Sequence, residues 1–301
     1  MTETKRTNLF ALLFFCYFIA VSLAVSAIPG LAQLSDSSYM MLMQLISFLP
    51  PLLLYFLFTK KDVKKTLRLR PLGWKNALLL LSFGISIQPI MSLLSYVTSL
   101  FFPNPVSESV GGIQSSGFLP SLIAVAILPP LLEEAFSRGI LLSGYTFLGK
   151  WRAAFASALL FALLHLNPQQ FPYAFLVGFV FCFLVERTGS LWASILPHII
   201  INGTTIFSIF SQTAADTTAA VEAAAEMSPG TILVSLSLMA LLSLPWLAVL
   251  LYLFLKVNPP EADLLLSDET GAPYQERFLT PSMILLFVLY AIFGLFPYLI
   301  L

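Results

Sequence analysis

The chain has 301 residues, of which 58% are hydrophobic and only 10% are charged. Its mean hydropathy of +0.90 excludes an ordinary soluble domain and predicts a polytopic membrane protein. The formal net charge is zero, and the two cysteines, Cys16 and Cys182, both lie in apolar runs, which excludes a disulfide framework and a Cys-x-x-Cys metal site.

Nine apolar runs are candidates for membrane helices. In chain order they cover about residues 8–28, 39–58, 76–102, 118–147, 153–166, 173–185, 190–210, 231–255 and 281–301. The first run is longer than the roughly 7–15 apolar residues of a signal peptide, so we expect an uncleaved span. The fifth and sixth are shorter than the roughly 20 residues that a perpendicular crossing needs. We therefore expect an all-α bundle of eight to nine transmembrane helices that forms a single membrane domain over residues 1–301.

The charged residues of the loops predict the orientation. With a cytoplasmic N-terminus, the inside segments contain every Lys and Arg except Arg138, and the only charged residues of the outside loops are acidic. This partition follows the positive-inside rule and suits a bacterial plasma membrane. Seven basic residues crowd the segment 60–75, and we expect them to face lipid headgroups. Because this cluster lacks interleaved aromatic residues, no nucleic-acid partner is expected.

Three polar motifs interrupt the apolar runs, and the first is Glu133-Glu134-x-x-x-Arg138. Ionisable groups within a membrane helix are costly and by default indicate a functional site. Glu134 and Arg138 are four residues apart and share a helix face, so we expect them to pair. Glu133 is turned away by about 100° and is left free for another role.

The other two motifs contain the only histidines of the chain. They are Phe161-x-x-x-His165 and His198-x-x-x-Asn202, and the second places an imidazole and an amide on one helix face. Taken singly, a buried histidine can be a packing residue, and an ion pair can hold two helices together. Because all three motifs lie on neighbouring runs, we expect instead that they form one functional pocket.

Hydrolysis of an amide suits such a pocket. Low-dielectric surroundings favour the uncharged form of a carboxyl group, so it can accept a proton near neutral pH, and a neutral imidazole can help to orient water. A second imidazole and an amide N–H can stabilise the oxyanion of a tetrahedral intermediate. No serine or cysteine lies in an obvious nucleophile motif, which favours an activated water over an acyl-enzyme.

In this order, the three motifs resemble those of the CAAX prenyl endopeptidase and bacteriocin-processing family (CPBP, or ABI) of intramembrane proteases. The stretch 189–194, Gly-Ser-Leu-Trp-Ala-Ser, also resembles the family's approach to its second histidine. The resemblance covers about residues 118–210, the expected catalytic core. Ser137 departs from the family pattern, since many members have Phe at this position.

The resemblance implies a helical bundle with a catalytic cavity inside the membrane. By the family's pattern, Glu133 and His165 would activate the water, and His198 and Asn202 would form the oxyanion site. Glu134 would hold Arg138, as the spacing also predicts. The implied substrate is a peptide or a membrane-anchored protein at the lipid bilayer, and the residues leave open whether it is prenylated.

Two questions stay open at this point. A zinc site needs about three protein ligands, which Glu133, His165 and His198 can supply, but no His-Glu-x-x-His motif is present, and we slightly favour a metal-independent mechanism. The alternative to a protease is a non-catalytic scaffold, an immunity protein or a transporter that uses the same polar pocket. Proline-interrupted helices, which also mark transport sites, motivate this alternative.

Overall fold

The computed structural model describes residues 1–103, 110–211, 227–259 and 276–299. Over these residues the chain forms helices and no strands, and eight helical segments are long and apolar enough to cross a membrane. These are α1 (Glu3–Ser26), α2 (Asp36–Thr59), α4 with α5 (Trp74–Ser99), the run from α7 to α9 (Phe118–Gly144), α11 (Phe171–Thr188), α12 (Trp192–Ser211), α14 (Pro229–Val257) and the run from α15 to α16 (Pro281–Leu299). The prediction of an all-α polytopic membrane protein is confirmed.

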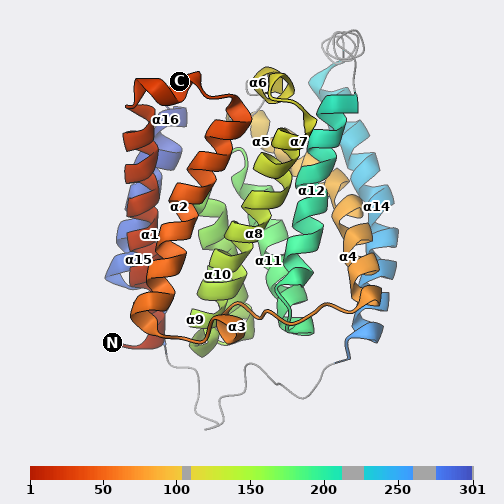
Figure 1. Cartoon of the computed structure of the whole chain (residues 1–301). Helices are drawn as coiled ribbons and strands as arrows, with labels where there is room; N and C mark the ends of the chain where they lie inside the picture. The colour runs from red at the N-terminus through yellow and green to blue at the C-terminus, as the bar shows by residue number, and fades with distance from the viewer. Residues whose placement is uncertain (104–109, 212–226, 260–275, 300–301) are drawn as a thin grey trace.

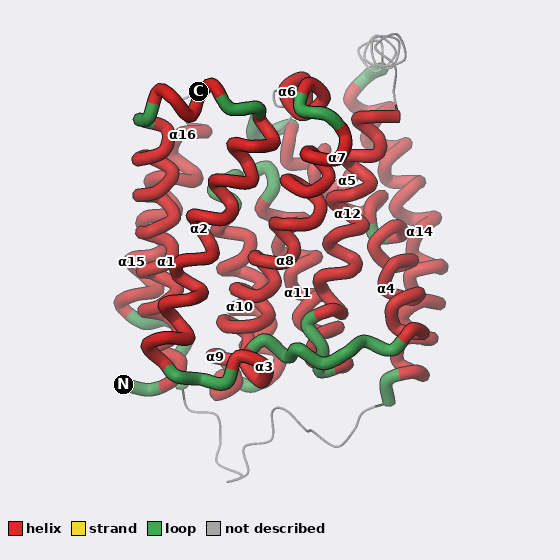
Figure 2. Tube along the Cα trace, viewed as in Figure 1, coloured by secondary structure: helices red, strands yellow, loops and turns green. Residues whose placement is uncertain are grey.

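The predicted fifth run is the helix that falls short of a full crossing. It forms α10 (Lys150–Leu164), which has 15 residues and packs along α11. The sixth run is longer than expected, because α11 begins at Phe171 and ends at Thr188. The chain starts at one end of the bundle and α16 ends at the other (Figures 1 and 2).

Short helices complete the bundle. They are η1 (Pro29–Gln33), α3 (Val63–Thr66), α6 (Val110–Ser115), η5 (Thr146–Leu148) and, within the last run, α15 (Pro281–Tyr290), η6 (Ala291–Leu295) and α16 (Phe296–Leu299). The third crossing is divided into α4 (Trp74–Ser86) and α5 (Gln88–Ser99), since Pro89 cannot continue the hydrogen-bond ladder of a helix.

The fourth crossing is the irregular one, and it carries the Glu-Glu motif. It consists of α7 (Phe118–Ser121), the π-helical turn η3 (Leu122–Ile127), α8 (Leu128–Glu134), a second π-helical turn η4 (Ala135–Leu141) and α9 (Leu142–Gly144). Such π-helical turns occur frequently at functional sites. In Figure 1, α8 lies in the middle of the bundle, between α2 and α12.

Close packing fixes the neighbours of this crossing. On one side, Phe136 stacks on Phe14 of α1 with ring centroids 4.0 Å apart and contacts Phe48 of α2 at 6.2 Å. On the other side, α12 packs against α4 at Gly84, where an added Cβ would lie 2.9 Å from the Pro197 carbonyl oxygen. A side chain at position 84 would therefore displace the helix that carries His198 and Asn202.

Candidate active site

A buried ion network joins the fourth crossing to α12. Oε1 of Glu134 accepts hydrogen bonds from Nη1 of Arg138 at 3.0 Å and from Nδ1 of His198 at 2.8 Å. Glu134 and Arg138 are fully buried, and His198 is 8% exposed. The expected pair of Glu134 and Arg138 is therefore present, and the same carboxylate also orients the imidazole.

The Arg138 guanidinium lies between aromatic rings. Its central carbon is 4.2 Å from the centre of the Phe161 ring and 5.5 Å from that of Phe181, a cation–π arrangement that favours a desolvated charge. Gly178 of α11 leaves room for it, because an added Cβ would lie 3.0 Å from Nη2. The cation is thus held by one carboxylate, two ring faces and the Ser137 hydroxyl, which accepts from Nη1 at 2.6 Å.

Glu133 and His165 line one cavity of about 150 Å³. The remaining lining comes mostly from apolar side chains, with one further polar group, Gln44 of α2. Nε2 of Gln44 donates to Oε1 of Glu133 at 2.9 Å. The cavity can hold water molecules, since one water needs only about 10–15 Å³ of accessible volume and a few polar partners.

The protonation of His165 follows from its hydrogen bond. Nδ1 lies 2.9 Å from the carbonyl oxygen of Phe161. A carbonyl oxygen can only accept, so Nδ1 carries a proton. In the neutral ring Nε2 is then an acceptor, the form that can take a proton from water. The Phe161 ring also contacts both imidazoles edge-on, with its centroid 4.9 Å from that of His165 and 6.1 Å from that of His198.

Asn202 compensates for two prolines. The carbonyl oxygen of Val125 would normally accept from the N–H at position 129 in an α-helix or 130 in a π-helix. Both positions are proline and have no N–H. Nδ2 of Asn202 donates to this oxygen at 2.9 Å. The side chain from α12 therefore supplies the hydrogen bond that this backbone carbonyl would otherwise lack within the membrane.

The expectation that all basic residues between 60 and 75 face lipid headgroups is wrong for Arg68. Its side chain is buried and donates to the carbonyl oxygen of Arg138 at 2.6 Å and to Oε1 of Glu186 at 2.7 Å. The Arg68 carbonyl in turn accepts from the N–H of Leu191 at 3.0 Å. Arg68 therefore connects the fourth crossing, the end of α11 and the start of α12.

We expect Arg68→Ala to lower the free energy of unfolding by about 3 kcal/mol, because it leaves the Glu186 carboxylate buried without its partner. Arg68→Lys should recover part of this loss, since it keeps the charge but not the planar fork. Unfolding in mixed micelles measures the effect. The matched control is Arg70→Ala, an exposed site expected to change stability by less than about 0.5 kcal/mol. Equal losses in both alanine variants would contradict the role of Arg68.

The structure thus brings the predicted residues together in two groups. Glu133 and His165 share the cavity, and His198 and Asn202 both bond to the fourth crossing. Sequence reasoning did not single out Gln44 or Arg68. Gln44 had a visible signal, an amide within an apolar run, whereas Arg68 looked like its basic neighbours.

The zinc alternative depends on the positions of the possible ligands. Among the described residues, no group of three or more His, Cys, Asp or Glu side chains is placed to hold a metal ion, and Nδ1 of His198 is occupied by Glu134. Glu133, His165 and His198 therefore do not form a ligand set in this arrangement. Metal independence stays a prediction.

Comparison with known proteins gives one family and one relative. Residues 115–204 match the sequence model of a family described as type II CAAX prenyl endopeptidase Rce1-like. The uncharacterized protein YpbD of Bacillus subtilis (strain 168) is 28% identical over 154 residues, which are 48% of this chain and 76% of that protein. No solved structure matches the chain. The matched segment includes the six predicted site residues, Glu133, Glu134, Arg138, His165, His198 and Asn202.

Proposed function

We propose that this protein is an intramembrane endopeptidase that uses an activated water, since residues 115–204 match the model of the Rce1-like family of type II CAAX prenyl endopeptidases. The observation that carries the proposal is the shared cavity of Glu133 and His165. A carboxylate and the acceptor nitrogen of a neutral imidazole line the same small volume. Both can take up the proton that water must lose as it attacks a peptide carbonyl.

In the proposed reaction, a water between Glu133 and Nε2 of His165 attacks the carbonyl carbon of the scissile peptide. The new C–O bond forms while a proton passes to Glu133, and the carbonyl becomes an oxyanion. Collapse of this intermediate breaks the C–N bond, and Glu133 returns the proton to the leaving amine. No covalent intermediate with the protein is formed.

His198 is the proposed oxyanion donor, and its hydrogen bond to Glu134 determines in which protonation state it can donate. Nδ1 donates to the Glu134 carboxylate, so Nε2 can donate to substrate only when the ring carries a second proton. The adjacent carboxylate stabilises that imidazolium, as in a catalytic triad. Asn202 supports it by fixing α12 to the fourth crossing, and in the proposal its second amide hydrogen would be a further donor to the oxyanion. Neither His198 nor Asn202 lines the cavity of Glu133 and His165, so both would reach the oxyanion only in the complex with substrate.

The proposed substrate is a peptide or a membrane-anchored protein, and whether it is prenylated stays open. The cavity of about 150 Å³ is smaller than the roughly 300–1,000 Å³ of typical ligand sites. A peptide therefore requires a movement of the surrounding helices. We further propose a bacterial plasma membrane with the N-terminus in the cytoplasm, since the N-terminus, α3 and α9, with their flanking basic residues, share one end of the bundle (Figure 1).

The proposal predicts that the purified protein in liposomes cleaves membrane-anchored peptides and that His165→Ala abolishes the cleavage. Mass spectrometry of the new termini measures it, and ¹⁸O from labelled water should enter the new carboxylate. Asp36→Asn, at an exposed site, is the control and should behave like the wild type. Full cleavage by His165→Ala would contradict the role proposed for His165, and absence of cleavage by the wild type would favour a binding protein. Loss of activity with a chelator, restored by zinc, would contradict metal independence.

A further inference from the structure

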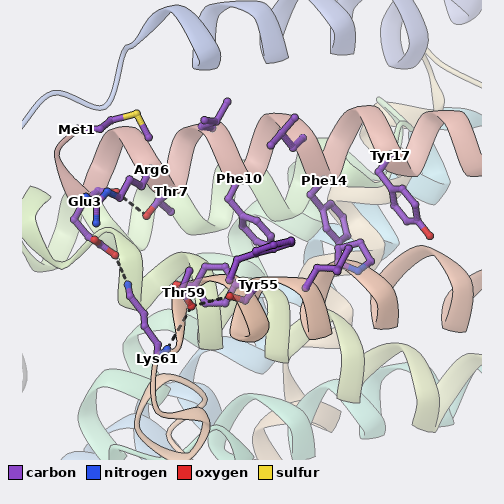
Figure 3. Close-up of a pocket in the computed structure, with 15 residues that line it drawn as sticks. Met1, Glu3, Arg6, Thr7, Phe10, Phe14, Tyr17, Tyr55, Thr59 and Lys61 are labelled. Atoms are coloured by element: carbon purple, nitrogen blue, oxygen red, sulfur yellow. Dashed lines mark hydrogen bonds and ion pairs between the residues drawn. The ribbon is translucent and has the colours of Figure 1, made fainter.

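A second and larger cavity lies between α1 and α2, outside the candidate active site (Figure 3). Its volume is about 670 Å³. Phe10, Phe14 and Tyr17 point into it from α1, and Tyr55 faces them from α2. We call this cavity the α1–α2 groove. Its volume lies within the range of small-molecule sites, and most of its lining side chains are apolar or aromatic.

Two polar links join α1 and α2 at the ends of the groove. At one end, the Lys61 ammonium forms an ion pair with Glu3 (Figure 3). At the other end, the Tyr17 hydroxyl donates to the carbonyl oxygen of Ile46 at 2.7 Å. That carbonyl lacks its usual helical partner because position 50 is proline. The groove is therefore a preformed feature of the two helices.

The dimensions of the groove match one leaflet of a bilayer. From Glu3 to Tyr17 it extends roughly 21 Å along α1, at 1.5 Å per residue. One leaflet contributes about half of the roughly 30 Å hydrocarbon core, and the headgroup region lies beyond it. Leu13 and Phe58 line the groove and are 59% and 79% exposed. An extended acyl chain would cover these surfaces.

The groove opens onto positive charge at the end of the bundle that carries the N-terminus. Lys5 and Arg6 of α1 and Lys60 after α2 are exposed there. The charge of Glu3 is neutralised by Lys61, and Arg6, which lines the groove, forms no ion pair among the described residues. This end therefore attracts an anionic headgroup.

We propose that the α1–α2 groove binds one anionic phospholipid, with an acyl chain between the helices and its phosphate at Arg6. The substrate is not the occupant, because the groove is closed toward the catalytic cavity. Phe14 is 1% exposed and stacks on Phe136 at 4.0 Å, so the two rings form a wall between groove and cavity.

The test uses the full chain reconstituted in nanodiscs of equal parts phosphatidylglycerol and phosphatidylcholine. After transfer to mild detergent, native mass spectrometry counts the retained lipids. The wild type should retain phosphatidylglycerol in preference to phosphatidylcholine. Arg6→Gln should weaken this preference about fivefold, the effect of about 1 kcal/mol per basic residue at the membrane surface. Leu13→Trp, which fills the groove, should lower the retention of both lipids.

Two matched variants control for unspecific effects. Lys75→Gln removes an exposed charge at the start of α4, and Leu242→Trp enlarges an exposed apolar side chain of α14. Both should retain lipid like the wild type. If Leu13→Trp does not fold, Leu54→Trp fills the groove from α2. Equal retention of the two lipids by the wild type would contradict the preference for an anionic headgroup. Unchanged retention in the groove-filling variant would contradict binding in the α1–α2 groove.

Discussion

Glu133→Gln is expected to reduce the turnover number by at least about 100-fold, the usual range for loss of a general base, and to leave the stability of the protein unchanged. Glutamine has the same shape, and its amide oxygen can still accept the hydrogen bond that Gln44 donates to position 133. What is lost is the ability to take a proton from water. The measurement is single-turnover cleavage of a membrane-anchored peptide, together with thermal unfolding.

Substrate capture separates catalysis from binding in this experiment. Glu133→Gln should still cross-link to the uncleaved peptide, because the walls of the cavity are unchanged. Asp36→Asn makes the same acid-to-amide change at an exposed site and should keep full activity. Wild-type turnover in Glu133→Gln would remove Glu133 from the mechanism, and unfolding of this variant would assign it a structural role instead.

Arg138→Leu is expected to destabilise the protein by about 5 kcal/mol. The guanidinium is fully buried and neutralises the equally buried Glu134, and removal of one member of such a pair leaves an uncompensated charge. The single variant Glu134→Leu should be destabilised for the same reason, since Arg138 would then lose its only carboxylate partner among the described residues. Equilibrium unfolding in mixed micelles measures both losses.

The double variant Glu134→Leu/Arg138→Leu distinguishes stability from function. Replacement of a whole buried pair by apolar side chains is often neutral or stabilising, so most of the lost stability should return. Activity should stay absent, because Nδ1 of His198 has lost the carboxylate that orients it. A double variant that is both stable and active would show that the network serves folding alone. A double variant as unstable as the single ones would contradict the electrostatic explanation.

Much of the site could be predicted where its geometry is local. The spacing of Glu134 and Arg138 predicts their pair within one helix, and the spacing of His198 and Asn202 predicts a shared face. The membrane character and helical fold follow from composition and apolar runs. These inferences need only the helical period and the cost of charge in hydrocarbon.

The remainder depends on contacts between segments that are distant in the sequence. The Glu134–His198 bond joins residues 64 positions apart, and the Arg68–Glu186 pair joins residues 118 positions apart. In the sequence, Arg68 looks like any basic residue of a headgroup-facing loop, and only its buried position distinguishes it from Lys64 or Arg70. Depth estimates along single helices also cannot show that Glu133 and His165 face one cavity.

The paired prolines of the fourth crossing determine which of its neighbouring helices can move. An outward movement of α12 would break two bonds. Asn202 would lose its bond to the Val125 oxygen, for which the fourth crossing supplies no donor of its own, and the Glu134–His198 bond would break as well. Beside the cavity, α2 is attached by the bond from Gln44 to Glu133, and near its N-terminus the Ser37 hydroxyl bonds to that of Ser121 in the fourth crossing. A peptide should therefore enter between the fourth crossing and the part of α2 near Gln44, and the displacement of Gln44 would free the Glu133 oxygen.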